Sequence, residues 1–492
     1  MNTSLHAQPA SVRPSSVGVN RRSFIKAGGA AVAAGSCACA AAVRGADRLA
    51  LLGGTPVISR DRAAANKRIF HWPIVNEAMR RVNDSILCEG RMSGIDVAAE
   101  FERKFAEWQG TKYASSAPNG TAALNAAFFA IGLGPGDELI CPSITYWASC
   151  MGAIHLGANV VFCDVKADDC TMDPASFEAH ITPRTKAVVV VHAYAQPCDM
   201  DPIMSIARRH GIKVVEDVSH AQGGRYKGRK LGTIGDCGAM SLMTGKSFAI
   251  GEGGMFVTDD PELYRRVVRW GQYERISRCW RPEEYAATKI LPFGGVKNRL
   301  NQCSAAIGIE QLKKYDAEIA EIARAHECFW GKIAGVAGLA NIFPSYPQSD
   351  KAGWYYARAH YSAEAFGGVP VASFVAALNA EVGRGDFNHG CNFPLHQSSV
   401  FFDEDMFRNG RPPATRNLPA GVSPRDLTGR LPVSESIAPK LIGMPWFKHC
   451  DADVIALYAE AVAKVAANVH ALRDWKPAAP AKPALTGWSS RS

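Results

Sequence analysis

The chain has 492 residues, more than one hydrophobic core normally serves, so we expect two domains with extensions at the ends. Its composition, with 47% hydrophobic and 21% charged residues, is typical of a soluble globular protein. The formal charge of +9 comes mainly from the two ends, because residues 1–46 hold five basic residues and no acid, and the tail from residue 476 holds three more. The body between them is close to neutral, so charge gives no reason to expect a nucleic acid as a partner.

The 14 cysteines are scattered singly, apart from Cys37 and Cys39. Neither a CxxC pair nor a paired Cys/His spacing occurs, so no zinc site or other metal site is predicted. We expect buried free thiols that act as small hydrophobic residues, and no disulfide framework.

Residues 1–46 are typical of a targeting leader. Residues 20–26, Asn-Arg-Arg-Ser-Phe-Ile-Lys, precede a weakly apolar run of small residues that ends near residue 43. This pattern resembles a twin-arginine export signal and predicts an exported or periplasmic protein. The run is too short and too rich in Gly and Ala to predict a stable membrane span. Two alternatives stay open: an organellar transit peptide, or a decayed signal on a cytoplasmic protein.

From about residue 75 to 260, short apolar runs alternate with helical ones, as a mostly parallel α/β sheet requires. The expected strands are 113–117, 138–142, 159–164, 185–192, 213–217, 238–243 and 254–258. The expected helices include 122–131, 146–156, 200–210 and 261–273, and a long helical stretch over 305–333 leads away from the sheet.

These patterns divide the chain into five parts. A leader (1–46) and an N-terminal segment (47–74) precede a large α/β domain (75–310), a smaller α+β domain (311–475) and a disordered tail (476–492). Residues 403–432 are rich in Pro, Arg and Gly, which predicts a long surface loop.

An anion site is predicted where Asn119-Gly120-Thr121-Ala122 follows the first strand and opens a helix. The glycine permits a tight turn, and free backbone N–H groups at a helix N-terminus bind anions. The Thr121 hydroxyl can add a donor. By itself this motif is weak, because many α/β turns look like it.

Three further groups follow strand ends. Tyr146 lies just past the strand 138–142, where an aromatic ring can stack on a flat heteroaromatic ring or simply pack in the core. Asp217 ends the strand 213–217, at the edge where α/β sheets bind ligands, although it could also cap a helix. His220 follows three residues later and could reach a ring substituent.

Lys246 stands in Thr-Gly-Lys-Ser just before the glycine-rich turn 251–254, and Ser241 precedes it by five residues. Gly-Lys-Ser at 245–247 suggests a P-loop, but that motif needs a glycine where this chain has Met240, so the P-loop is rejected. A lysine before such a turn, preceded by an acid at a strand end, is what a pyridoxal 5'-phosphate (PLP) enzyme needs: the lysine forms a Schiff base and the carboxylate keeps the ring nitrogen protonated.

Phosphate turn, aromatic, acid, serine and lysine in this order resemble the DegT/DnrJ/EryC1/StrS family of PLP-dependent aminotransferases. The resemblance runs from about residue 49 to 445 and is dense in 119–124, 134–140, 216–224 and 246–254. It implies fold type I, a homodimer and an amino transfer from an amino acid, glutamate or glutamine, to a keto-sugar or keto-cyclitol.

The resemblance also implies roles for single residues. Gly120, Thr121, Ala122 and Ser241 would bind the phosphate, Tyr146 would stack on the ring, and Asp217 would pair with its nitrogen. Lys246 would be the Schiff-base lysine. His220, where the family often has glutamine, would donate to the phenolate oxygen.

Other implied contacts come from segments that depart from the family pattern. Lys297, in a segment that lacks the family's flanking tyrosines, would reach the phosphate of the partner subunit. Arg299 and His396 are candidates for substrate contact, and a structural role for His396 is equally open.

Two other functions remain as alternatives. The chain could be a PLP-binding regulator or sugar-binding module without transaminase activity, or a PLP-dependent sugar dehydratase. Some relatives replace the lysine by histidine and dehydrate sugars, so Lys246 argues against the dehydratase.

Overall fold

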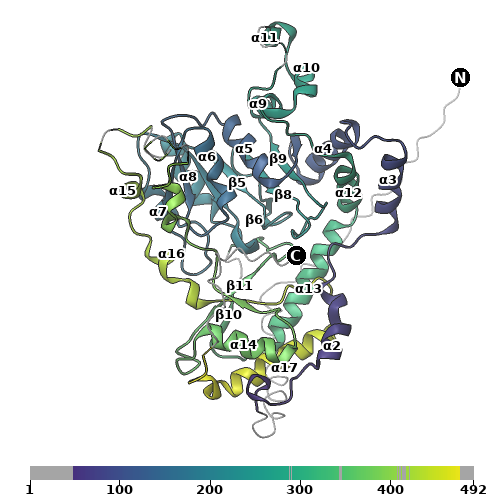
Figure 1. Ribbon diagram of the computed structural model, residues 1–492, viewed down its shortest axis with the longest axis vertical. Coiled ribbons are helices and arrows are strands. Elements are labelled where there is room, and N and C mark those ends of the chain that lie inside the picture. The colour runs from purple at the N-terminus through teal and green to yellow at the C-terminus, as the bar shows by residue number, and fades with distance from the viewer. Residues whose placement is uncertain are drawn as a thin grey trace, which may run out of the picture. The chain divides into compact units, whose positions relative to one another are not determined.

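The computed structural model describes residues 48–286, 289, 291–342, 346–406, 408, 410, 412, 417–419 and 421–476 (Figure 1). The expected leader and the expected tail beyond residue 476 lie outside the described residues, so the twin-arginine interpretation stays a prediction.

A seven-stranded sheet with strand order β1-β9-β8-β5-β4-β2-β3 forms the centre of the large domain (Figure 1). All neighbouring strands in it pair in parallel except at β9, which is antiparallel to both β1 and β8. The strands are β1 (Tyr113–Ala117), β2 (Glu138–Pro142), β3 (Asn159–Cys163), β4 (Thr185–Val191), β5 (Lys213–Asp217), β8 (Cys237–Ser241) and β9 (Gly254–Thr258).

Helices cover both faces of this sheet, which is why its strands are almost continuously buried rather than alternately buried and exposed. One face packs against α5 (Gly120–Ala130), α6 (Met151–His155) and α9 (Pro261–Gly271). The other packs against α4 (Asp96–Gln109), α7 (Pro174–Ala179), α8 (Met200–His210) and α12 (Gln302–Leu312). The mostly parallel α/β fold of the prediction is confirmed.

Shorter elements border the sheet. They are α3 (Glu77–Cys88), the hairpin of β6 (Arg225–Tyr226) and β7 (Arg229–Lys230), α10 (Ile276–Cys279), α11 (Pro282–Tyr285), α15 (Pro424–Thr428) and α16 (Pro432–Ser436). α10 and α11 extend away from the sheet (Figure 1). The predicted loop 403–432 includes α15, whose Thr428 hydroxyl accepts a hydrogen bond from the Phe162 N–H of β3 at 3.1 Å.

The predicted helix over 305–333 is two helices, because α12 ends at Leu312 and α13 (Tyr315–Ile333) starts anew. Lys314 has φ −124°, outside the helical range, between them. The Tyr315 hydroxyl donates to the Gln222 carbonyl at 2.9 Å and lies 2.9 Å from the Ser247 hydroxyl. These buried contacts fix the break beside the segment that carries Lys246.

A four-stranded antiparallel sheet with order β10-β11-β13-β12 and the helices α13, α14 and α17 form the smaller α+β part. Its further elements are β10 (Leu339–Asn341), β11 (Arg358–Tyr361), α14 (Val371–Val382), β12 (Asn388–His389), β13 (Leu441–Gly443) and α17 (Ala452–Ala467). No helix of the described residues is long and apolar enough to cross a membrane.

The N-terminal segment packs into this smaller core, with Leu49 and Ile58 buried beside Phe329. It includes α2 (Arg60–Ala65). The buried carboxylate of Glu381 accepts hydrogen bonds from the Ala50 N–H at 2.8 Å and the Val57 N–H at 3.1 Å. It also pairs with Lys464 at 3.0 Å. A buried carboxylate needs several donors, and Glu381 takes them from two distant parts of the chain. Glu381 therefore joins the N-terminal segment to Lys464 of α17.

Candidate active site

The phosphate turn meets β8 in a very close backbone approach. Asn119 caps α5 by accepting the Ala122 N–H at 2.9 Å, while the first turn of a helix leaves its other N–H groups without intrahelical partners. A Cβ at Gly120 would lie 2.6 Å from the Ser241 Cβ, so only glycine fits there. The structure thus brings Gly120, Thr121 and Ser241 together as a cradle for an anion.

Asp217 lies buried at the carboxyl end of β5. One carboxylate oxygen accepts the Ser149 hydroxyl at 2.7 Å, and the other accepts the Ser219 N–H at 3.0 Å. Both contacts orient the carboxylate, and each oxygen keeps lone-pair capacity for a further donor. Its neighbour Glu216 points to the other face, where it accepts from His192 and three backbone N–H groups.

Lys246 follows β8 in the turn that leads to β9. Burial lowers the pKa of its ammonium to about 8, against an ordinary value of about 10.4, and the charge of Asp217 opposes part of this shift. A larger fraction of its amine is therefore neutral, and nucleophilic, near neutral pH than in an exposed lysine.

Tyr355 and Trp72 hold the lysine in place from remote segments. The Lys246 Nζ donates to the Tyr355 hydroxyl at 3.2 Å and lies 4.3 Å from the centre of its ring. The Trp72 Nε1–H donates to the Lys246 carbonyl at 2.9 Å. Tyr355 is flanked by Trp354 and Tyr356 in left-handed backbone conformations, with φ of 50° and 48°. Such strain concentrates at functional sites.

His220 lies between Tyr194 and Tyr355, with ring centroids 6.2 and 4.6 Å away. Removal from water and repulsion by Lys246 and Arg358 lower the pKa of His220 well below its usual range, so its imidazole is neutral. Its Nδ1 accepts the Tyr194 N–H at 3.3 Å, which leaves the other ring nitrogen to carry the proton and donate. Tyr194 itself is buried with a left-handed φ of 55°.

Tyr146 immediately precedes the short 3-10 helix Trp147–Ser149 and is 41% exposed. Its ring lies 4.9 Å from that of Trp147. Burial raises the pKa of Tyr355, the residue whose hydroxyl contacts the Lys246 Nζ. Stacking of the Tyr146 ring on the cofactor stays a prediction of the resemblance.

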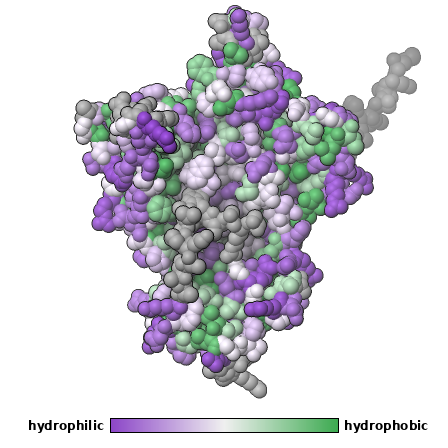
Figure 2. All heavy atoms as spheres, in the orientation of Figure 1, coloured by the Kyte–Doolittle hydropathy of each residue, from purple (hydrophilic) through white to green (hydrophobic). Residues whose placement is uncertain are grey.

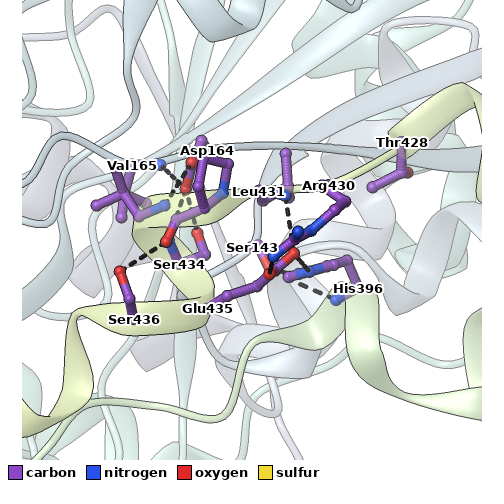
Figure 3. A network of polar contacts seen from close by, with 12 residues as sticks. Ser143, Asp164, Val165, His396, Thr428, Arg430, Leu431, Ser434, Glu435 and Ser436 are labelled. Carbon is purple, nitrogen blue, oxygen red and sulfur yellow. Dashed lines mark hydrogen bonds and ion pairs between the residues drawn. The ribbon is translucent and has the colours of Figure 1, made fainter.

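His396 belongs to a polar network around Glu435 and Asp164 (Figure 3). Its Nδ1 lies 2.7 Å from the Ser143 hydroxyl and its Nε2 3.5 Å from Glu435. Both ring nitrogens thus have structural partners, which favours the structural role over substrate contact. Through Ser143, the network braces the residues that lead from β2 to Tyr146.

Lys297 and Arg299 do not join Lys246 within one chain. Lys297 is exposed, with its Nζ 5.5 Å from the centre of the Tyr273 ring. Arg299 forms an ion pair with Glu274, and both side chains are mostly shielded from solvent. The pair uses one nitrogen of the guanidinium, whose other N–H groups can still donate, so a substrate contact by Arg299 stays a prediction.

The donors present fit PLP, whose parts are a phosphate, an aldehyde and a ring nitrogen. The cradle at Gly120 and Ser241 suits a phosphate, the amine of Lys246 suits an aldehyde, and the buried carboxylate of Asp217 suits a protonated pyridine nitrogen. All three come from the carboxyl edge of β1, β5 and β8.

Sequence reasoning missed Trp72, Ser149, Tyr194, Tyr355 and Arg358. No spacing relates them to Lys246, since Tyr355 follows it by 109 positions. The run of three aromatics at residues 354–356 was the available signal.

The fold and the site define a PLP-dependent aminotransferase of fold type I. A model of the DegT/DnrJ/EryC1/StrS aminotransferase family matches residues 74–423, and the chain therefore belongs to that family. The predictions of fold class, family, enzyme class and cofactor are confirmed.

Three comparisons illustrate the relationship. The chain is 41% identical to the GDP-perosamine synthase of Caulobacter vibrioides. That match covers 48% of this chain and 61% of the synthase, which is less than two thirds of its length. It is 32% identical to the L-glutamine:2-deoxy-scyllo-inosose aminotransferase of Streptoalloteichus tenebrarius, over 68% of this chain and 79% of that one. The structure of an aminotransferase from Psychrobacter cryohalolentis superposes with a TM-score of 0.67 at 26% identity, covering 81% of this chain and 99% of that chain.

The lowered pKa of Lys246 predicts a distinct reactivity in the cofactor-free protein. Acetylation of Lys246 by acetic anhydride should rise with pH to a midpoint near 8, because only the neutral amine reacts. The rate is read by mass spectrometry of the peptide that contains Lys246, with the exposed Lys112 as internal reference. A midpoint above pH 10 for Lys246 would contradict the burial argument.

Proposed function

We propose that the protein moves the amino group of glutamate or glutamine to a keto-sugar or keto-cyclitol. The observation that carries this proposal is the buried Lys246, whose pKa is lowered to about 8. It occurs together with the buried carboxylate of Asp217 and the cradle formed by Gly120 and Ser241. The names of the relatives, a GDP-perosamine synthase and a glutamine:inosose aminotransferase, support a sugar or cyclitol as the acceptor.

Lys246 would hold the cofactor and also handle protons. When bound there, PLP supplies an electron sink that stabilises negative charge at the donor Cα. The Nζ of Lys246, when free, takes the proton from the donor Cα and later delivers a proton to the carbon of the acceptor carbonyl. A pKa near 8 suits both directions, because about a tenth of the amine is neutral at pH 7, far more than in an ordinary lysine, and the ammonium remains available as the acid.

Asp217 and His220 would fix the charge distribution around this chemistry. The Asp217 carboxylate, oriented by Ser149 and Ser219, holds a proton at the ring nitrogen. The free N–H of the neutral His220 imidazole can donate to the phenolate oxygen of the ring. Tyr146 would cover one face of the ring, and the first turn of α5 would hold the phosphate.

Replacing Lys246 by Ala should abolish covalent attachment of the cofactor, abolish or displace its visible absorption band, and lower turnover by at least about 10²–10⁴-fold, the usual contribution of acid–base catalysis. The measurement is the absorption spectrum before and after glutamate is added. In the unaltered protein, glutamate should bleach the band. Lys313→Ala, at an exposed position, is the control.

The outcomes also separate the alternatives. Persistence of the band in Lys246→Ala would remove Lys246 from its role. An unaltered protein that keeps its band with every amino donor would favour a PLP-binding module without transaminase activity. Water loss from a keto-deoxysugar without amino transfer would favour the dehydratase.

We also propose that the protein acts as a homodimer. Large apolar side chains stand exposed around Lys297, among them Leu291 at 68%, Phe293 at 71% and Val296 at 39%. Leu87 and Met92 are exposed near the end of α3, and apolar residues gather there and near the α10–α11 extension on the face shown in Figure 2. Exposed apolar clusters of this kind are typical of subunit contacts. Lys297 would then lie at a contact from which it can reach the partner subunit.

Phe293→Glu should dissociate the dimer, because a buried unpaired carboxylate costs about 3 kcal/mol or more, a weakening of roughly 100-fold. Light scattering of the purified protein gives the mass. Lys440→Glu also makes the charge more negative, but at an exposed position away from this surface, and should leave the mass of the dimer unchanged. A monomeric unaltered protein, or a dimeric Phe293→Glu, would refute this surface as the contact.

Export through the twin-arginine route remains our proposal for the location of the protein, supported by residues 20–26 alone. Export would favour a free keto-sugar or inosose over a nucleotide-linked acceptor, because nucleotide-linked sugars are cytoplasmic. Cell fractionation should find the protein in the periplasm and find an Arg21→Lys, Arg22→Lys double variant in the cytoplasm. Cytoplasmic retention of both proteins would refute the proposal.

A further inference from the structure

Arg358, the first residue of β11, is a buried cation without an anion. It is 8% exposed, and its Nε and Nη1 atoms have no hydrogen-bond partner among the described residues. No carboxylate of the described part of the chain forms an ion pair with it. Buried arginines are normally paired, because the guanidinium stays charged at all accessible pH values.

The surroundings of Arg358 compensate its charge only in part. The guanidinium carbon lies 4.9 Å from the centre of the Tyr194 ring and 6.0 Å from that of Tyr356. Aromatic faces attract cations, but less than a carboxylate does. A Cβ at Gly443 on the neighbouring β13 would overlap Nη1, so glycine there makes the room that the guanidinium occupies.

A short chain of contacts links Arg358 to the reacting lysine. Tyr194, whose ring lies under the guanidinium, donates its N–H to His220. The His220 ring lies 4.6 Å from the ring of Tyr355, whose hydroxyl contacts the Lys246 Nζ. The pKa values of His220 and Tyr355 both respond to the charge of Arg358, which agrees with this closeness.

Six titratable groups near Arg358 are neutral near pH 7. Those whose pKa responds to its charge include the thiols of Cys170 and Cys391, the phenols of Tyr194 and Tyr355, and the imidazoles of His220 and His389. Burial raises the pKa of the thiols and phenols and lowers that of the imidazoles, so all six are uncharged. None of these six groups supplies an anion to Arg358.

We infer that Arg358 binds the carboxylate of the amino donor and so places the donor amine at Lys246. This rests on the proposed function, since an amino-acid donor carries a carboxylate on the carbon that bears its amine. A planar guanidinium matches a planar carboxylate with two parallel hydrogen bonds. Arg358 is a substrate-binding residue in this assignment, and the smaller α+β part thereby selects amino acids as donors.

The test uses 4-carbamoylbutanoate, which keeps the single carboxylate and the amide of glutamine but has no amine to react. Calorimetry should show that the cofactor-loaded protein binds it, and that Arg358→Gln weakens the binding about 10- to 100-fold, as expected for charge-assisted hydrogen bonds. Pentanediamide, the uncharged analogue, should bind both proteins equally. Arg384→Gln, which removes an arginine that is already paired with Asp386 in the same part of the chain, should bind like the unaltered protein.

Thermal unfolding gives a second readout that does not depend on turnover. Arg358→Gln should be at least as stable as the unaltered protein, because it removes an unpaired buried charge. 4-Carbamoylbutanoate should raise the unfolding temperature of the unaltered protein and not that of Arg358→Gln. Arg358→Lys, which keeps the charge but loses the planar fork, should show an intermediate affinity.

Equal affinity of the unaltered protein and Arg358→Gln for 4-carbamoylbutanoate, or no binding to either, overturns the inference. The inference is also overturned if Arg358→Gln slows only the amination of the acceptor, because Arg358 would then bind an anion of the acceptor and not the carboxylate of the donor. Bleaching of the visible band by L-glutamine in the unaltered protein tests the proposed function separately. Carboxylate binding that depends on Arg358, without bleaching, would uphold Arg358 and refute the transferase.

Discussion

Strands β5 and β8 lie side by side in parallel, with Asp217 opposite Ala239. Because the carboxyl ends of parallel strands meet at one edge, this pairing sets the acid of β5 beside the turn that carries Lys246. β9 then returns antiparallel between β8 and β1, which brings the Gly120 turn against Ser241. Phosphate cradle, acid and lysine thus depend on the order of neighbouring strands, and a change in that order would separate them.

Burial and charge together tune the groups that this order collects. Water is excluded around Lys246, so its ammonium loses a proton more easily, and Asp217 limits the effect. Lys246 and Arg358 in turn keep His220 neutral. The site therefore holds more positive than negative charge, which suits a reaction whose cofactor brings a phosphate and whose donor brings a carboxylate.

Unusual backbone conformations and contacts from the smaller α+β part occur together at the site. Tyr194 and the residues around Tyr355 adopt left-handed conformations that non-glycine residues rarely occupy, and both stretches are held by contacts to His220 and Lys246. The segment with Tyr355 and Arg358 comes from the smaller α+β part, whose core also includes the N-terminal residues tied to Glu381.

Local patterns were enough to predict the large sheet and most of the cofactor site. Strands 113–117, 138–142, 213–217 and 254–258 and helix 200–210 have the predicted bounds. The strands are short buried segments, and the helix is an amphipathic stretch that ends just before Gly211. The strand predicted over 159–164 ends one residue earlier, at Cys163. The order of Gly120, Asp217, Ser241 and Lys246 along the chain likewise indicated the cofactor and the family.

Tertiary structure alone decided the rest. The break between α12 and α13 follows from buried hydrogen bonds of Tyr315, which no local propensity encodes. The same holds for His396, whose partners Ser143 and Glu435 lie far away in the sequence. Tyr355 contacts Lys246 although 109 positions separate them in the sequence. Only the folded structure shows that two nitrogens of Arg358 are buried without a hydrogen-bond partner among the described residues. Sequence determines which residues can do chemistry at a strand end, whereas burial and partners, which set pKa and unmet charge, exist only after the chain has folded.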